Sequence, residues 1–380
     1  MRRSKIVINC LPSLSPFLKN EVIDLGYKPL KVDNSGVTVE GGWKEAVELN
    51  LHLRTASRIL WLIRSFEARD PHQLYLEAKK TPWHKLIPDN GYISIQSFVK
   101  NDFIKDTRFA NLKLKDAIVD QISEKTGNRP DSGKEKDRTV VFLFWYQKQV
   151  HLYFDTSGET ISKHGYRKNP FKAPMMESLA AACILSSGWN AKKGSFINPM
   201  CGSGTLAIEA AMMSANIPAG LERKNFGYMH IQGYDPDFHL AARSELQPKP
   251  RIQCDIVATD RDIGAVKASH ENARNAGVFD MIHFDKVPFE KTFMPRGPGI
   301  VILNPEYGER LGEVENLKTV YHQIGDFFKN SCQGKTGYIF TGNMELAKNV
   351  GLRSKSRTPF LNARIDCRLL EYELYSGSKK

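Results

Sequence analysis

Two patterns of hydrophobic and polar residues divide the chain near residue 174. Before that point, apolar runs such as TVVFLFWYQ predict strands, and helical spacing of apolar residues in ANLKLKDAIVDQISEKTG predicts a helix, in an irregular order. After it, strands and helices alternate, beginning with the strand GSFINPM and the helix GTLAIEAAMMSA. The first pattern is typical of α+β modules. The second predicts an α/β domain with a doubly wound, mostly parallel sheet.

Length and composition fit a soluble globular chain of two or three domains. The sequence has 380 residues, of which 41% are hydrophobic and 25% are charged. No window reaches the ~18 uninterrupted apolar residues of a membrane span, and the first ten residues lack the small-residue cleavage site of a secretory signal. The 6 cysteines show neither zinc-ligand spacing nor a disulfide framework. We therefore expect a cytoplasmic protein with reduced thiols.

Positive charge is concentrated in the first part of the chain. Residues 1–200 hold 31 Lys and Arg against 21 Asp and Glu, whereas the remaining residues hold 23 against 21. A basic excess attracts polyanions such as nucleic acids through long-range electrostatics. It also promotes solubility, so charge alone leaves both interpretations open.

The segment ISKHGYRKNPFKAP, residues 161–174, is basic and aromatic and contains no acidic residue. Such a segment can bind phosphates and stack on bases, and it can equally be a solvated linker between domains. The first interpretation predicts an RNA contact through five side chains, namely Lys163, His164, Arg167, Lys168 and Lys172.

A glycine turn follows the first strand of the α/β region. In NPMCGSGTLAIEAA, residues 198–211, Gly202 and Gly204 allow a tight turn and a close approach of the backbone to a ligand. A dinucleotide site would need an acidic residue about twenty positions later, but Asp260, which ends the strand DIVATD, comes 56 residues after Gly204. The polar residues of the turn suit an amino-acid end rather than phosphates. The pattern therefore favours S-adenosylmethionine over NAD.

A second polar group ends the strand IVIL, where Asn304, Pro305, Glu306 and Tyr307 follow in succession. The lone pair of an exocyclic amine on a base is delocalised into the ring, so the amine becomes a nucleophile only when acceptors hold its N–H groups. The Asn304 side chain and the Pro305 carbonyl offer two acceptors, and Tyr307 can stack on the base. Because parallel strands bind ligands at their carboxyl ends, the two motifs predict one methyl-transfer site.

Five motifs in order make the chain resemble a known family. They are DTSGE (155–159), HGYR (164–167), APMME (173–177), NPMCGSGTLAIEAA and NPEYGERLG. The chain resembles the THUMP-domain class I methyltransferases, and most closely the 23S ribosomal RNA guanine-N2 methyltransferases. The resemblance covers nearly the whole chain. It implies a ferredoxin-like domain in residues 1–45, a THUMP RNA-binding domain in 46–155 and a Rossmann-like catalytic domain in the remainder. With the basic composition of the segment included, we predict a basic linker in 156–174 and the catalytic domain in 175–380.

The resemblance also implies roles for single residues. Asp260 would bind the ribose hydroxyls of the cofactor, and residues 304–307 would be the catalytic tetrapeptide. The methionine and ribose side of the cofactor would be lined by Asn198, Met200, Gly202, Gly204 and Thr205.

Three positions depart from the usual pattern of that family. Asn198 stands where Asp is common, which removes a charge but keeps an acceptor. Pro288 stands where an Asp usually contacts the adenine amine, so adenine recognition is expected from the backbone near Phe289 or from Asp285. Glu306 replaces the second proline of Asn-Pro-Pro-Tyr. A carboxylate there can accept from guanine N1–H or take up the released proton, or it can face solvent without a role.

These observations predict an enzyme that transfers a methyl group from S-adenosylmethionine to the N2 amine of a guanine in RNA, with 23S rRNA as the expected substrate. Two alternatives stay open at this point. One is a tRNA guanine-N2 methyltransferase, and the other is a non-catalytic RNA-binding ribosome-assembly protein. The 10 histidines show no paired ligand spacing, so we expect no metal, and we expect no membrane partner.

Overall fold

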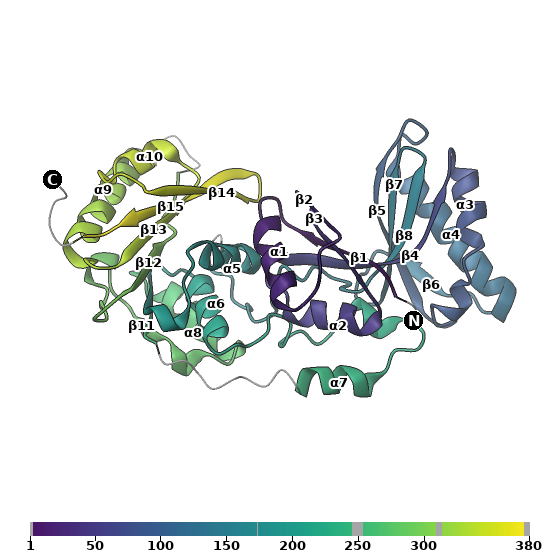
Figure 1. The fold of residues 1–380 in the computed structure, drawn as a ribbon, viewed down its shortest axis with the longest axis horizontal. Helices are drawn as coiled ribbons and strands as arrows, with labels where there is room; N and C mark the ends of the chain where they lie inside the picture. Colours follow the sequence, from purple (N-terminus) through teal and green to yellow (C-terminus); the bar gives the residue numbers. More distant parts are fainter. Residues whose placement is uncertain (1–2, 173, 245–253, 309–313, 376–380) are drawn as a thin grey trace. The chain divides into compact units, whose positions relative to one another are not determined.

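The computed structural model describes residues 3–172, 174–244, 254–308 and 314–375. Contacts divide these residues into two compact units, which we describe separately (Figure 1). The N-terminal unit takes its described residues from 1–10, 18–161 and 223–246, and the C-terminal unit takes its own from 11–17, 162–222 and 247–380. Within the described ranges, no helix is both long and apolar enough to cross a membrane.

One mixed sheet organises the N-terminal unit. Its strands are β1 Ser4–Cys10, β2 Lys31–Asp33, β3 Gly36–Gly41, β4 Ala56–Glu67, β5 Tyr92–Lys100, β6 Asp131–Gly133, β7 Thr139–Tyr146 and β8 Gln149–Asp155. They lie in the order β2-β3-β1-β4-β8-β7-β5-β6. The antiparallel pairing of β4 with both β1 and β8 makes the sheet continuous across the predicted ferredoxin-like and THUMP parts.

Most helices of this unit bury apolar residues against the sheet, whereas α7 Pro236–Ser244 buries only His239. The helices are α2 Trp43–His52, α3 Pro71–Lys79, α4 Thr107–Thr126 and α7, with the short 3₁₀ helices η1 Trp83–Lys85 and η3 Gly227–His230. Helix α1 Ser15–Asp24 is divided between the two units, because its residues up to Phe17 belong to the C-terminal unit and those from Leu18 belong to the N-terminal unit. The side chains of Asp70 and Asp106 cap α3 and α4 by accepting from backbone N–H groups.

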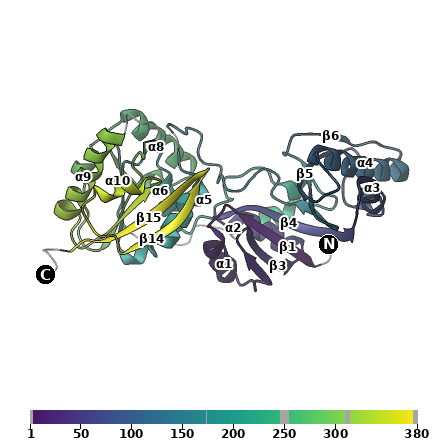
Figure 2. The same ribbon diagram turned by 90° about the horizontal axis from the view of Figure 1, so that it is seen from above.

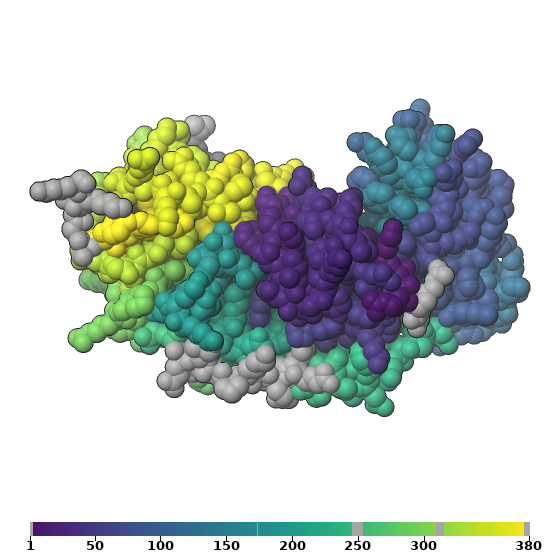
Figure 3. Space-filling model, viewed as in Figure 1, coloured from purple at the N-terminus to yellow at the C-terminus, as the bar shows by residue number. Residues whose placement is uncertain are grey.

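Residues 223–246 join the N-terminal unit although the sequence pattern placed them in the α/β region. Phe226, Tyr228 and Ile231 are buried in the hydrophobic core of that unit. Helix α7 remains at its surface, as the green spheres in Figure 3 show, and Leu240 is 61% exposed. Part of the segment between the first two strands of the α/β region, residues 223–246, therefore belongs to the N-terminal unit and contributes to its core.

A second sheet organises the C-terminal unit. Its strands are β9 Ser195–Pro199, β10 Ile256–Thr259, β11 His283–Asp285, β12 Gly299–Leu303, β13 Thr336–Thr341, β14 Ser356–Asn362 and β15 Ile365–Glu373. They lie in the order β11-β10-β9-β12-β13-β15-β14, and β15 runs antiparallel to both neighbours. Figure 2 shows β14 and β15 together at one edge. The predicted doubly wound, mostly parallel sheet is confirmed.

Helices between the parallel strands complete this α/β unit. They are α5 Glu177–Ser186, α6 Thr205–Ser214, α8 Ile263–Asn275, α9 Val314–Ser331 and α10 Met344–Lys348, with the 3₁₀ helices η2 Ala191–Lys193, η4 Phe279–Met281 and η5 Phe289–Lys291. Strands β9, β10 and β12 are short apolar runs, as expected for parallel strands that are covered on both faces. The chain passes from β9 to β10 on one side and later to β12 on the other. The edge between β9 and β12 is therefore the switch point where such sheets bind ligands.

Candidate active site

Three of the predicted residues lie at the carboxyl ends of three adjacent strands. Asn198 of β9 pairs with Ala258 of β10, and its Nδ2 donates to the carbonyl oxygen of Ile302 in β12 at 2.9 Å. Asp260 and Asn304 each follow these partners by two residues. The structure therefore brings the ends of the two sequence motifs together at the switch point.

Asp260 holds the backbone of the turn after β9 through a hydrogen bond. Gly202 N–H donates to Asp260 Oδ2 at 3.0 Å, while Asp260 Oδ1 accepts from Asp262 N–H at 2.9 Å. Gly204 has a φ of 83°, and a Cβ added there would lie 3.0 Å from the Ser269 side chain. Both conformation and space thus favour glycine at 204, and Asp260 fixes the turn that it was predicted to accompany.

Asn198 presents an acceptor that no described residue satisfies. The residue is 1% exposed, and its Oδ1 is buried without a hydrogen-bond partner among the described residues. A buried acceptor without a partner is unfavourable, so it suits a ligand that brings a donor. The ammonium of an amino-acid end is such a donor, and these residues therefore fit S-adenosylmethionine.

Among the described residues, those after β12 include one buried polar atom without a hydrogen-bond partner and a tyrosine that is held by hydrogen bonds. Asn304 Oδ1 is likewise buried and without a partner in the described part of the chain, and Pro305 is buried. The Tyr307 hydroxyl accepts from Asn362 Nδ2 at 3.0 Å, and burial raises the pKa of Tyr307 to about 12. Glu306 is exposed. The remainder of NPEYGERLG, from residue 309, lies outside the described residues.

The other predicted cofactor residues have mixed placements. The Thr205 hydroxyl is engaged by the protein, because Arg167 Nη1 donates to it at 3.1 Å. Asp285 ends β11 with an exposed side chain. Phe289 is 8% exposed and packs edge-on against Phe327, with ring centroids 5.5 Å apart. Its ring therefore belongs to the core, and only its backbone remains for the expected adenine contact.

The basic segment is packed in part, which corrects the sequence interpretation for two of its five basic residues. His164 is 1% exposed, and its Nδ1 lies 2.7 Å from Oε1 of the buried Glu209 on α6. Arg167 pairs with the buried Glu177 at 2.6 Å. Burial removes His164 from any surface that RNA could contact, and the ion pair with Glu177 leaves the Arg167 side chain only 10% exposed. The exposed basic side chains of the segment are Lys163, Lys168 and Lys172.

Several supporting residues had no signal in the sequence. Asn343 Nδ2 donates to the Tyr307 carbonyl at 3.2 Å, and the Tyr321 hydroxyl donates to the Glu306 carbonyl at 3.4 Å. These residues and Asn362 come from distant parts of the chain, so local spacing could not connect them. The described ranges contain no group of three or more His, Cys, Asp or Glu residues that could hold a metal ion.

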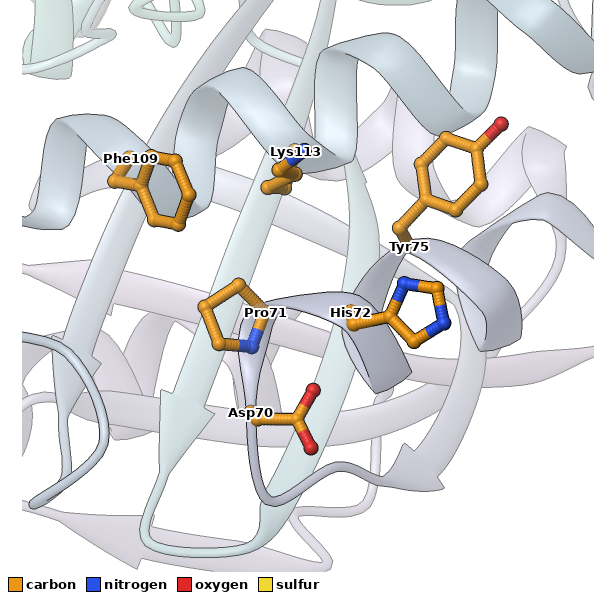
Figure 4. A pocket seen from close by; sticks show the side chains of 6 residues that line it. All are labelled: Asp70, Pro71, His72, Tyr75, Phe109 and Lys113. Carbon is orange, nitrogen blue, oxygen red and sulfur yellow. The ribbon is translucent and has the colours of Figure 1, made fainter.

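A separate hollow of about 390 Å³ lies in the N-terminal unit, and Figure 4 shows its lining. Phe109 and Lys113 come from α4, and Asp70, Pro71, His72 and Tyr75 come from α3 and its cap. Phe109 is 47% exposed, and Lys113 Nζ lies 5.6 Å from its ring centroid. The hollow thus combines aromatic surface with a cation.

Comparisons with known proteins match three domain models to successive parts of the chain. The model of the RMKL-like methyltransferase domain matches residues 164–371. The models of the RlmL ferredoxin-like domain and of the THUMP domain match residues 5–60 and 68–155. The three kinds of domain expected from the sequence are thereby confirmed, while the boundaries at residues 45, 155 and 174 stay predictions.

Individual relatives and one solved structure show the same likeness. The "Ribosomal RNA large subunit methyltransferase K/L" of Syntrophotalea carbinolica is 33% identical over 373 residues, which are 95% of this chain and 52% of that protein. "Putative RNA methyltransferase slr0064" of Synechocystis sp. is 30% identical, with 95% of this chain and 94% of that protein covered. The crystal structure of SMU.472 complexed with SAH has a TM-score of 0.88 at 24% identity, with 100% of both chains covered. The chain spans about half the length of the K/L relatives.

Proposed function

Because the chain belongs to the family with an RMKL-like methyltransferase domain, we propose that it transfers a methyl group from S-adenosylmethionine to the N2 amine of a guanine in RNA, with 23S rRNA as the substrate. The family assignment favours S-adenosylmethionine over NAD as the cofactor. Such a substrate belongs to the cytoplasm.

One observation carries this proposal: Asn198, Asp260 and Asn304 share one edge of the sheet. Asn198 bridges to β12 through Ile302, and Asp260 is bonded to Gly202 of the turn. A methyl transfer needs the nucleophile and the methyl donor to meet in line, and rigid strands provide that alignment. The same edge therefore serves both partners of the reaction.

On the cofactor side, the chain offers fixed polar groups. The free Oδ1 of Asn198 would accept from the ammonium of the methionine end, and Asp260 would accept from the ribose hydroxyls. Gly202 leaves room for the ligand to approach the backbone, because nothing lies within 4 Å of a Cβ added there, whereas Gly204 lets the turn pack against Ser269. When bound, S-adenosylmethionine supplies a methyl group on a sulfonium, and its transfer requires no metal.

On the substrate side, Asn304 and Pro305 would activate the amine. The free Oδ1 of Asn304 and the carbonyl oxygen of Pro305 would accept the two N–H groups of the guanine N2 amine, which returns electron density to the nitrogen. Tyr307 would stack on the base. Its hydroxyl accepts from Asn362, and its backbone carbonyl accepts from Asn343, so both ends of the residue are held. The exposed Glu306 would accept from guanine N1–H or take up the released proton.

The N-terminal unit would bind the RNA. It contains the THUMP match, and the first 200 residues hold the basic excess. The hollow beside Phe109 offers a stacking surface with Lys113 for a phosphate. In the other unit, Lys163, Lys168 and Lys172 would add phosphate contacts.

The test is methylation of separated RNA substrates. Ribosomal RNA and tRNA from cells that lack the gene are incubated with the purified chain and S-adenosylmethionine, and their nucleosides are analysed by mass spectrometry. We expect N2-methylguanosine in the 23S rRNA fraction. N2-methylguanosine in tRNA alone would support the tRNA alternative, and a methylated adenine would contradict the guanine assignment. A protein that binds RNA but transfers no methyl group would support the assembly-protein alternative.

A further inference from the structure

The segment from His164 to Lys172 forms part of the wall around the glycine turn. His164 and Tyr166 are 1% exposed, so the segment enters the interior of the C-terminal unit at these residues. Its backbone reaches α8, and its arginine reaches the first residue of α6. Both helices also contact the turn that is proposed to hold the cofactor.

Asn272 on α8 connects this segment to the turn with four hydrogen bonds. Its Oδ1 accepts from the N–H groups of Lys168 at 3.0 Å and Asn169 at 3.1 Å. Its Nδ2 donates to the carbonyl oxygens of Asn169 at 2.8 Å and Ser203 at 3.1 Å. Asn272 is 0% exposed. A side-chain amide has two N–H donors, and its oxygen can accept two hydrogen bonds. All four hydrogen-bonding positions of the Asn272 side chain are therefore used. Its partner Ser203 lies between the two glycines of the turn.

Arg167 makes the second connection. Its Nη1 donates to the Met175 carbonyl at 2.6 Å and to the Thr205 hydroxyl at 3.1 Å, and its Nη2 pairs with Glu177 at 2.6 Å. Thr205 follows Gly204 and begins α6. The planar guanidinium serves these oxygens from two nitrogens in a fixed geometry, which the single nitrogen of a lysine does not reproduce.

The turn has a conformation that needs such support. Met200, Gly202 and Gly204 all have positive φ, at 59°, 56° and 83°. For Met200 this is an unfavourable backbone region, and such strain persists only where the surroundings impose it. The hydrogen bonds from Asn272 and Arg167 are part of those surroundings.

We propose that Asn272 and Arg167 are positioning residues that hold the glycine turn in the shape that binds S-adenosylmethionine. The inference rests on the proposed function of that turn. Neither side chain needs to touch the cofactor. Their effect is on the affinity for the cofactor, because they set the backbone that forms its site before it binds.

The first experiment uses Asn272→Asp. A carboxylate keeps the acceptor for Lys168 and Asn169 but loses both donors and faces two carbonyl oxygens, so the connection to Ser203 is lost. We expect the Kd for S-adenosylhomocysteine, measured by calorimetry, to rise roughly tenfold, as removal of a buried hydrogen-bond partner predicts. The KM for S-adenosylmethionine should rise in parallel while kcat stays within about twofold, as expected when only binding is affected.

Asn275→Asp is the matched control. It makes the same substitution on the same helix, at a half-buried residue for which the structure shows no bond to the turn. Amide exchange of residues 200–206 without ligand gives a readout independent of activity. It should accelerate in Asn272→Asp and not in Asn275→Asp.

Arg167→Lys decides the question if Asn272→Asp fails to fold. It keeps the positive charge beside Glu177 but loses the planar two-nitrogen geometry that serves the three oxygens, and its Kd for S-adenosylhomocysteine should rise by roughly three- to tenfold. Arg274→Lys, at an exposed position on α8, is the control. A folded variant with the parental Kd, or an equal rise in its control, overturns the inference. If the parent binds no S-adenosylhomocysteine, the proposed function fails and takes the inference with it.

Discussion

The glycine turn after β9 and the tetrapeptide after β12 lie at the same edge of one sheet, yet the protein holds them differently. The turn is bonded from outside by Asp260, Ser269 and Asn272, which contact Gly202 or Ser203. The tetrapeptide is supported at Glu306 and Tyr307, while the buried Asn304 Oδ1 has no partner in the described ranges.

This difference matches the two partners of the proposed reaction. A cofactor of constant shape is bound best by a site that is formed in advance, because less ordering is then required on binding. An RNA base must bring its own donors, so the acceptors that receive them are left open. Disruption of the turn should therefore weaken cofactor binding, and disruption of the tetrapeptide should slow transfer.

The largest separation is expected for Asn304→Ala. Loss of one acceptor aimed at the reacting amine should lower kcat by about 10³-fold, comparable to removal of a preorganised transition-state hydrogen bond. The Kd for S-adenosylhomocysteine should stay within about twofold, because within the described residues Asn304 Oδ1 makes no hydrogen bond to the turn. Single-turnover kinetics and calorimetry measure the two quantities. Equal losses of rate and affinity would contradict the separation.

Asp260→Ala tests the other side. It removes the acceptor for the N–H groups of Gly202 and Asp262 as well as the proposed ribose contact. The Kd for S-adenosylhomocysteine should rise by roughly fiftyfold, since two or three hydrogen bonds of about 1 kcal/mol each are lost. Asp255→Ala, immediately before the opposite end of β10, is the control and should bind as the parent does.

Gly204→Ala should weaken cofactor binding by roughly tenfold, because the positive φ and the contact with Ser269 together displace the turn. Gly277→Ala is matched to it, since Gly277 has a φ of 68° but nothing within 4 Å of an added Cβ. The control carries the backbone strain without the contact. It should lower the free energy of unfolding by about 1 kcal/mol and leave the Kd unchanged. A higher Kd for S-adenosylhomocysteine in both variants would show that general destabilisation, and not the contact with Ser269, weakens cofactor binding.

Much of this site could be predicted because its signals are local. Apolar runs that end in polar groups identified β9, β10 and β12, and glycine spacing identified the turn between β9 and α6. The rule that parallel strands bind ligands at their carboxyl ends then joined the motifs without any knowledge of their distance.

The misassigned residues depended on partners far away in the sequence. His164 and Arg167 are basic and lie beside aromatic residues, as in an RNA-binding loop, but Glu209 and Glu177 neutralise them in the interior. Composition does not show burial when the opposing charge lies on another element. The same limit applies to Phe226 and Tyr228, whose apolar side chains fit either core by pattern and are placed by tertiary packing.

The support of Tyr307 gives a prediction about alkaline pH. Burial raises the pKa of Tyr307 to about 12, above the unfolded value of about 10. In this window the unfolded state loses the proton first, so the stability that the neutral hydroxyl provides is present below pH ~10 and is lost as pH rises toward 12. Tyr307→Phe should therefore reduce the decline of the unfolding free energy between pH 9 and 11, measured in urea against the parent. An unchanged decline would contradict the burial of this hydroxyl.

Because the aromatic ring remains in Tyr307→Phe, its kcat should fall less than about tenfold.

The smallest effect is expected at Glu306, where the proposed substrate contact comes from an exposed side chain. Glu306→Gln keeps an acceptor but removes the charge, so kcat should fall by roughly two- to fivefold, the range of one exchanged hydrogen bond to a charged group. Glu306→Pro supplies the ring that is usual in the tetrapeptide and removes the acceptor altogether. If the carboxylate takes up a proton, the two variants should differ from the parent in how kcat depends on pH. Parental rates at every pH in both variants would show that Glu306 only faces solvent, and that Asn304 and Pro305 alone activate the amine.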